Sequence, residues 1–288
     1  MGIREQGYHK WDGQLRAPRF AWLPIFWVGI KMAFRKKYSK ALFMATNAPF
    51  LAFLGGVYVS TRPELKMFPR IVELLKIDAR FFSVFYTNGF LIFMLMMLCL
   101  VLFVDLICGD LKSNSFPLYF SRPLDRMDYI LGKFSIILFY LLLFTLVPGL
   151  LLMIFKFIFT GAISLDPRLL LGILVVPILV SIFFASMTLM VSSLTSNGRY
   201  VRIIILLVFI FSNSIAQILK SIFRSPYCEL FSVARNIEQM GAYVFNTQPV
   251  FSAPKFLSLA IILGLSVLSI FILYKKIGKS EAQIEIGS

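Results

Sequence analysis

Six long runs without a charged residue constrain the fold of this chain more than any other feature. They lie at residues 41–61, 81–104, 134–155, 169–198, 203–219 and 256–274. A helix needs about 20 mostly apolar residues to cross roughly 30 Å of hydrocarbon, and each run is near or above that length. Because a helix satisfies its own backbone in lipid, the runs predict an all-α membrane protein. The six spans are predicted near 41–61, 81–104, 134–155, 169–195, 203–220 and 256–274.

The composition supports lipid as the solvent of most side chains. Hydrophobic residues make up 59% of the 288 residues, charged residues only 15%, and the mean hydropathy is +0.83. Soluble domains carry about a quarter charged residues. Membrane β-strands would show alternation over about ten residues, and none of the runs alternates. We therefore expect one transmembrane domain over residues 1–288.

The net charge of +15 predicts an orientation in the membrane. Most lysines and arginines fall in 1–40, 105–133, 199–202 and the segment after 274, which six spans would place on one side. The positive-inside rule then puts both termini in the cytoplasm. Basic residues beside a bilayer also attract anionic lipid headgroups, so we expect membrane lipids and no nucleic acid as partners.

Residues 1–18 form a polar tail, and residues 19–37 predict a helix in the membrane interface. In this segment Lys31 and Arg35 lie on a different helical face from the apolar residues, and Trp22 and Trp27 suit the headgroup region. Such a pattern is typical of an amphipathic helix on the cytoplasmic surface. The alternative is a distorted extension of the first span.

The segment 221–255 is too apolar for a solvated loop and too short to cross the membrane twice. Three prolines divide it, and apolar residues between them recur at helical spacing. These features predict a helical or re-entrant element before the last span, at a depth where protein or water satisfies its backbone.

Sites for soluble enzyme chemistry are missing from the sequence. No glycine-rich P-loop precedes a Lys-Ser or Lys-Thr pair. His9 is the one histidine, so no Ser/His/Asp set can form, and we expect no catalytic residue and no metal site in this chain. The span centres carry no charge, which argues against a proton relay.

Four polar side chains within or beside the spans are candidates for a translocation seam between helices. They are Asn47, Asn88, Asn213 and Gln217. Taken one by one, ordinary helix–helix hydrogen bonding is the favoured explanation of each. For Asn47, a third explanation is a kink near Pro49 in which the amide caps a freed carbonyl.

The densest charged stretch, 105–134, separates the second and third runs. Residues 109–114 predict a turn that ends the second span, residues 116–120 are apolar, and Ser121-Arg122-Pro123 breaks the chain again. Asp125 is placed to help cap a new helix that leads into the third span.

This stretch resembles the membrane subunits of type-2 ATP-binding-cassette (ABC) exporters. Their second span is followed by an acidic or polar residue and then by Leu-Tyr-x-Ser-Arg-Pro-x-x-Arg-x-x-Tyr-x-x-Gly-Lys. The residues of this chain that match are Asp110, Leu118, Tyr119, Ser121, Arg122, Pro123, Arg126, Tyr129, Gly132 and Lys133.

The resemblance implies a permease subunit of an ATP-driven exporter in the cytoplasmic (inner) membrane of a bacterium. Two such subunits, identical or homologous, would pair, and two cytoplasmic ABC ATPase subunits would dock beneath them. ATP and magnesium would bind those partner chains and not this one. The loop between spans two and three would form the coupling helix, and the interfacial helix would also contact the ATPase.

The chemistry of the loop agrees with a partner-facing role. An apolar ridge flanked by charges fixes register in an interface. The ridge is predicted at Phe116, Leu118, Tyr119 and Phe120, and the charges at Arg122, Asp125, Arg126 and Asp128. The alternative is a solvated loop anchored to lipid phosphates. Two other functions stay open at this point: a membrane-embedded lipid-modifying enzyme, and an assembly factor that does not transport.

Overall fold

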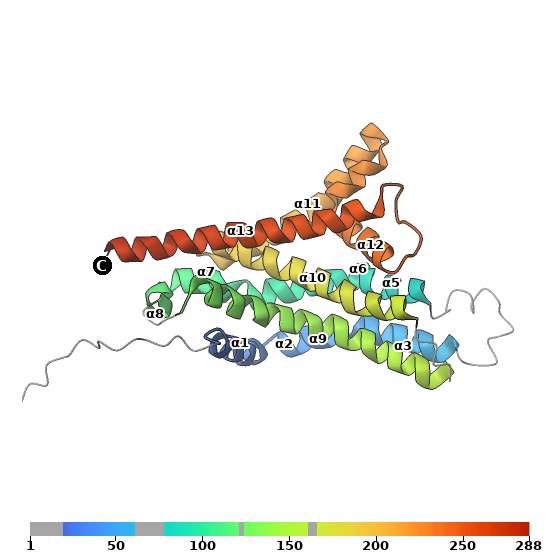
Figure 1. The fold of residues 1–288 in the computed structure, drawn as a ribbon, viewed down its shortest axis with the longest axis horizontal. Coiled ribbons are helices and arrows are strands. Elements are labelled where there is room, and N and C mark those ends of the chain that lie inside the picture. Colours follow the sequence, from blue (N-terminus) through green and yellow to red (C-terminus); the bar gives the residue numbers. More distant parts are fainter. Residues whose placement is uncertain (1–19, 61–77, 121–123, 161–165, 288) are drawn as a thin grey trace, which may run out of the picture.

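The computed structural model describes residues 20–60, 78–120, 124–160 and 166–287, and every regular element within them is a helix (Figure 1). In chain order these are α1 (Leu23–Arg35), α2 (Ser39–Thr46), α3 (Ala48–Ser60), α5 (Ala79–Thr87), α6 (Gly89–Leu98), the π-helix η2 (Cys99–Phe103), α7 (Asp105–Lys112), α8 (Phe116–Phe120), α9 (Arg126–Thr160), α10 (Pro167–Leu194), α11 (Gly198–Phe223), the 3₁₀ helix η3 (Pro226–Phe231), α12 (Val233–Val244) and α13 (Lys255–Gly287).

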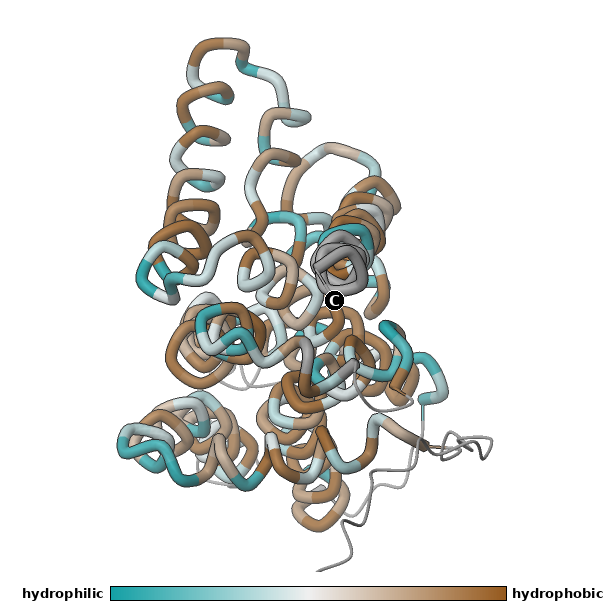
Figure 2. The backbone as a smooth tube through the Cα atoms, turned by 90° about the vertical axis from the view of Figure 1, so that its left-hand side faces the viewer, coloured by the Kyte–Doolittle hydropathy of each residue, from teal (hydrophilic) through white to brown (hydrophobic). Residues whose placement is uncertain are grey.

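Six helical segments among the described residues are long and apolar enough to cross a membrane, in agreement with the predicted fold class. They are Ser39–Ser60, Gly89–Lys112, Arg126–Phe159, Pro167–Leu194, Gly198–Phe223 and Lys255–Gly278. Figure 2 shows apolar residues along the lengths of the helices and polar residues gathered at their ends and turns.

Two breaks interrupt the first two spanning regions. At Asn47 the amide donates to the carbonyl of Phe43 at 2.8 Å, between α2 and α3. Asn88 separates α5 from α6, and its side chain accepts from the backbone N–H of Phe90 at 2.9 Å. The continuous span predicted over 81–104 is therefore divided at Asn88, because an asparagine cap starts a new helix there.

The segment 105–134 contains more helix than the sequence predicted. Residues 109–112 belong to α7, so the predicted turn is wrong for them, and the chain turns only after Lys112, where Asn114 has a φ of 50°. Helix α9 begins at Arg126, so the helix expected after Asp125 does form and continues without a break into the third span. Charged residues end a run of hydrocarbon-compatible sequence, but they do not end a helix.

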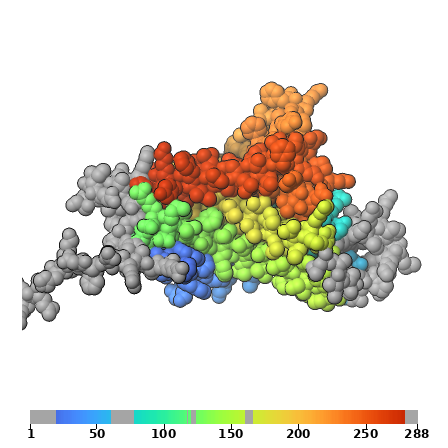
Figure 3. All heavy atoms as spheres, viewed as in Figure 1, coloured from blue at the N-terminus to red at the C-terminus, as the bar shows by residue number. Residues whose placement is uncertain are grey.

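The helices form an elongated bundle with two distinct ends. Helices α1, α7 and α8 lie at one end with the C-terminal part of α13, while α5 and α12 lie toward the other end (Figure 1). We call the first of these the α8 end. Helix α10 packs against α9 and α13 in the middle of the bundle, and α1 packs across α9 (Figure 3).

Helix α11 diverges from the rest of the bundle (Figures 1 and 2). Only 11% of its apolar 18-residue stretch is buried, against 61% in α10. Beyond it, η3 and α12 form the helical element expected between 221 and 255, and α12 packs against α5, α10 and α13. The buried amide of Gln239 holds the following loop by donating to the carbonyls of Phe251 and Ala253 at 3.1 and 3.0 Å.

Candidate functional site

The stretch that carries the family resemblance lies at the α8 end of the bundle, between the end of α7 and the start of α9. Helix α8 follows the turn at Asn114, and α9 begins at Arg126. The carbonyl of Asp125 accepts from the N–H of Tyr129 at 3.1 Å, so Asp125 occupies the position directly before the first helical turn. Ser121, Arg122 and Pro123 lie outside the described residues.

A buried ion pair connects α7 to α9. The ammonium of Lys133 lies 2.8 Å from Oδ2 of Asp110, and their side chains are only 8% and 17% exposed. The hydroxyl of Tyr129 donates to the same oxygen at 2.7 Å. Tyr129 and Lys133 are four residues apart, so they share one face of α9. We call Asp110, Tyr129 and Lys133 the loop brace.

Aromatic rings from α8 complete the packing around the loop brace. Tyr119 meets the ring of Tyr129 edge-on with centroids 5.1 Å apart, and Phe116 lies 5.6 Å from the same ring. The Lys133 ammonium is 5.5 Å from the ring centroids of both tyrosines, within the range of a cation–π contact. Helix α8 is therefore fixed to the same side chains that join α7 to α9.

The predicted apolar ridge is only partly available to a partner. Phe116 is 4% exposed because it packs inward on Tyr129, and Tyr119 is half-buried. Leu118 is 74% exposed. The side chain of Phe120 lies outside the described set. Leu118 thus provides the main apolar projection among the described residues of α8.

The predicted flanking charges separate into different environments. Asp125 is exposed, whereas the guanidinium of Arg126 lies against α13, where a Cβ added to Gly278 would be 2.7 Å from it. Arg126 thus faces the C-terminal helix. No local sequence pattern indicates this contact, because the two residues are far apart along the chain.

Helix α1 was predicted as the interfacial helix. Two glycines allow it to pack closely against the start of the third span. A Cβ on Gly132 would lie 2.9 Å from Cβ of Ile25, and a Cβ on Gly29 would lie 2.1 Å from Cδ1 of Ile136. Trp22 packs on Phe26, and the exposed residues of the helix include Trp27, Lys31 and Arg35. The matched motif residue Gly132 is therefore one of two positions where α1 and α9 pack too closely for a larger side chain.

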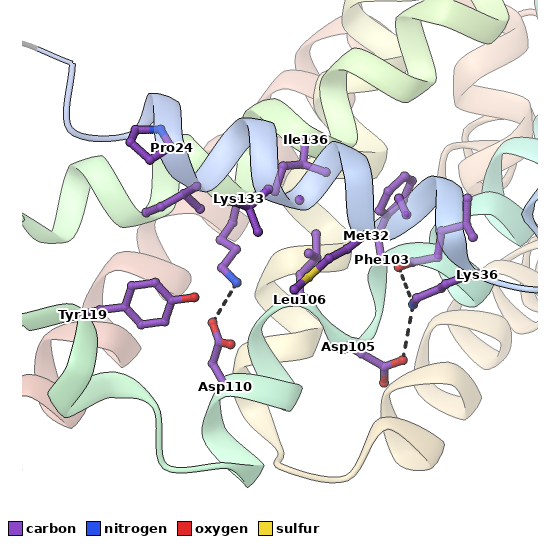
Figure 4. A pocket seen from close by; sticks show the side chains of 15 residues that line it. Pro24, Met32, Lys36, Phe103, Asp105, Leu106, Asp110, Tyr119, Lys133 and Ile136 are labelled. Carbon is purple, nitrogen blue, oxygen red and sulfur yellow. Dashed lines mark hydrogen bonds and ion pairs between the residues drawn. The ribbon is translucent and has the colours of Figure 1, made fainter.

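A cavity of about 410 Å³ lies between α1, α7 and α9 (Figure 4). Most of its lining is apolar and includes Val28, Met32 and Leu106. Its charged lining groups are paired: Lys133 with Asp110 at one side and Lys36 with Asp105 at the other. Within the described ranges no group of three or more His, Cys, Asp or Glu side chains could hold a metal ion.

The four candidate seam residues are not brought together. Asn47 and Asn88 make the local helix caps described above. Asn213 accepts from the hydroxyl of Ser232 at 3.3 Å, and Gln217 is exposed on α11. No hydrogen bond within the described ranges joins any two of them, and a role in a translocation path stays a prediction.

Sequence reasoning selected Asp110, Tyr129 and Lys133 one by one but missed that they form a single brace. The i, i+4 spacing of Tyr129 and Lys133 was the available signal, and an acid one loop away was the natural partner. In the comparisons with known proteins, the family model described as "ABC-2 family transporter protein" matches residues 21–277. A search of curated proteins gave no match.

Proposed function

Since the chain belongs to the ABC-2 family of transporter proteins and is a membrane subunit of such a transporter, we propose that it couples ATP hydrolysis on separate cytoplasmic subunits to the export of a substrate. The segment α7–α8, with the start of α9, is the surface that receives the ATPase. Helix α1 lies beside it and adds a second contact.

The proposed assembly has two copies of the ATPase and a second membrane subunit, identical or homologous to this one. The complex sits in the inner membrane with the α8 end in the cytoplasm. The positive-inside rule supports this orientation. Residues 20–60 contain five cations and no acid, and their cations cluster near the α8 end. They are Lys31, Arg35, Lys36, Lys37 and Lys40.

The loop brace is the observation that carries the coupling proposal. A loop that only connects two spans would bend when pushed. Here Asp110 belongs to the end of the second span, and Lys133 and Tyr129 belong to the start of the third. Because α8 packs on the ring of Tyr129, a displacement of α8 is passed to both spans together.

Leu118 and the neighbouring Arg122 give the most direct test of the docking surface. We expect Leu118→Glu and Arg122→Glu each to weaken ATPase binding roughly thirtyfold or more, the range typical of a central interface residue. Tyr243→Glu is the matched control, because Tyr243 is 46% exposed on α12 at the opposite end. The measurement is co-purification of the ATPase with the tagged subunit, followed by ATP hydrolysis in lipid nanodiscs.

Unchanged ATPase binding in both loop variants would refute the docking surface. Full activity of the purified subunit without any ATPase would instead favour an enzyme or an assembly factor. Orientation is tested separately by labelling a cysteine placed at Leu118 in sealed inverted and right-side-out vesicles. We expect labelling in inverted vesicles only, and labelling from the outer face would overturn the proposed topology.

A further inference from the structure

The second span contains an irregular helical turn between α6 and α7, on the side of the α8 end. Its helix is regular over α6, widens into the π-helix Cys99–Phe103, and resumes as α7 at Asp105. A π-helix bonds each N–H to the carbonyl five residues back, which makes it less stable than an α-helix. Such segments are uncommon and often mark functional positions.

Side chains from three other parts of the chain donate to carbonyls of this irregular turn or of Val104 directly after it. Lys36, which follows α1, donates to the carbonyl of Leu102 at 2.8 Å. Arg202 on α11 donates through Nε to the carbonyl of Leu100 at 3.3 Å. The hydroxyl of Ser192 on α10 donates to the carbonyl of Val104 at 2.6 Å.

The two cations also meet at one carboxylate. Oδ2 of Asp105 lies 3.6 Å from the ammonium of Lys36 and 3.3 Å from the guanidinium of Arg202. Figure 4 shows the Lys36 side chain reaching both a backbone oxygen beside Phe103 and Asp105. The three side chains are 35% to 47% exposed, so these ion pairs are long and solvated, and each is weak by itself.

Helix α11 meets the second span in this region, and farther along it also packs on α10, where the rings of Phe209 and Phe184 lie 6.4 Å apart. A Cβ added to Gly198, at the start of α11, would lie 2.6 Å from Oδ1 of Asp105. Most of the remaining length of α11 is exposed. The segment α7 continues directly through the turn at Asn114 into α8. Asp105 therefore stands between the proposed docking surface and α11.

We propose that this irregular turn is the joint through which movement of α7 and α8 reaches α11, and that Lys36 and Arg202 are its positioning residues. We call Lys36, Asp105, Ser192, Arg202 and the π-helix the inner joint. The inference rests on the proposed function. A π-turn yields more easily than the α-helical segments on either side. When the π-turn deforms, Lys36 and Arg202 make α1 and α11 move with it, because they contact its carbonyls and Asp105.

The test uses the complete complex of membrane subunit and ATPase in lipid nanodiscs. Lys36→Gln and Arg202→Gln remove one cation each, and Lys37→Gln and Arg199→Gln are matched controls on exposed neighbours. We expect the two joint variants to bind the ATPase normally. The ATP hydrolysis that depends on this subunit should fall roughly two- to thirtyfold, the range seen for residues that act through coupling. Lys36→Arg keeps the positive charge and the hydrogen-bond donors, so it should retain the normal rate of ATP hydrolysis.

A distance measurement separates coupling from a merely structural role. Spin labels at Lys112→Cys and Tyr200→Cys, both exposed positions, report on α7 and α11 in a Cys228→Ser background. In the otherwise unchanged subunit we expect the label distance to shift between nucleotide-free and vanadate-trapped complexes. In Arg202→Gln the shift should be lost while the complex stays assembled. An identical shift in the variant would overturn the inner joint.

The remaining outcomes are also decisive. If Arg202→Gln fails to accumulate, Arg202→Lys takes its place. This variant keeps the charge beside Asp105 but loses the guanidinium contact to the carbonyl of Leu100. The proposal again requires a smaller shift in the label distance. Deletion of Val101 removes one residue of the π-turn. We expect this variant to fold, to bind the ATPase and to lose the shift, whereas a retained shift contradicts the proposal. If the unmodified subunit binds no ATPase, the proposed function itself fails and the inner joint fails with it.

Discussion

Lys133 on α9 holds its ammonium 2.8 Å from the carboxylate of Asp110 on α7, at a site where neither side chain is more than 17% exposed. Desolvation of two charges is costly, and it is offset only when the pair has good geometry and further hydrogen bonds. Tyr129 supplies such a bond, and the rings of Tyr119 and Tyr129 flank the ammonium. The pair is therefore sensitive to removal of one partner.

Lys133→Met is expected to destabilise the subunit by about 3 kcal/mol, because Asp110 would remain buried without its cation. The double variant with Asp110→Asn should recover most of this loss, since the neutral amide oxygen still accepts from Tyr129. Unfolding by SDS titration measures both values. Lys112→Met, on an exposed position of α7, is the control. A double variant no more stable than Lys133→Met alone would contradict the pairing.

Tyr129→Phe isolates the hydroxyl of the loop brace. A hydrogen bond to a charged group contributes about 2 kcal/mol, so we expect a loss near that value in the same titration. Tyr119→Phe removes a hydroxyl from the neighbouring ring while keeping the aromatic contact and the cation–π contact. Equal losses in the two variants would argue against a special role for the hydroxyl of Tyr129.

Gly29→Ala tests the close contact between α1 and α9. The added methyl group would lie 2.1 Å from Cδ1 of Ile136, and overpacking of this kind costs about 1–3 kcal/mol. Gly55→Ala is the matched control, because nothing lies within 4 Å of that position. It should be neutral or stabilising by up to about 1 kcal/mol.

The three heavy atoms nearest to the added Gly29 methyl all belong to the Ile136 side chain. A double-mutant cycle with Ile136→Ala should therefore show strong coupling, with the double variant less destabilised than the sum of the single changes. Additive effects would mean that α1 does not pack on α9 at this point.

Gln239→Leu tests the loop before the last helix. The amide oxygen accepts from the N–H of Val250 at 2.7 Å and its nitrogen donates to two carbonyls of the same loop. Leucine leaves these buried groups without partners, so hydrogen exchange at Val250 should become at least about tenfold faster, which corresponds to about 1.4 kcal/mol. Gln248→Leu, an exposed position nearby, should leave exchange unchanged.

The sequence predicted the spans because lipid imposes one requirement on each of them: enough consecutive uncharged residues. It indicated the helix that leads into the third span, but it did not predict that α7 continues through residues 109–112. Residues 109–112 and 126–133 carry charges, yet they are helical because α7 and α9 pair those charges with each other or place them at the bundle end. Asn88 was identified as a polar residue near the second span, but its effect as a helix cap required the local backbone geometry.

The candidate site was predicted in part. The motif identified Asp110, Tyr129, Gly132 and Lys133 by position, while the buried state of Phe116 and the placement of Arg126 against α13 depend on packing between distant segments. The contacts of Lys36 and Arg202 with the second span join residues 66 and 102 positions apart. Nothing local in the sequence specifies such contacts, and a π-helix has no composition that distinguishes it from its apolar neighbours.

The length of α9 has a mechanical consequence. Its 35 residues extend for about 52 Å, far more than the roughly 30 Å thickness of the hydrocarbon. A helix of this length exceeds the hydrocarbon, so part of it lies outside the bilayer if it spans, and in its first turns Tyr129 and Lys133 contact Asp110 of α7. A tilt of about 5° around its first turn would move the far end by roughly 4 to 5 Å. Pro148 removes one backbone hydrogen bond within this helix, so we expect a tilt at the α8 end to be divided between the segments before and after that proline.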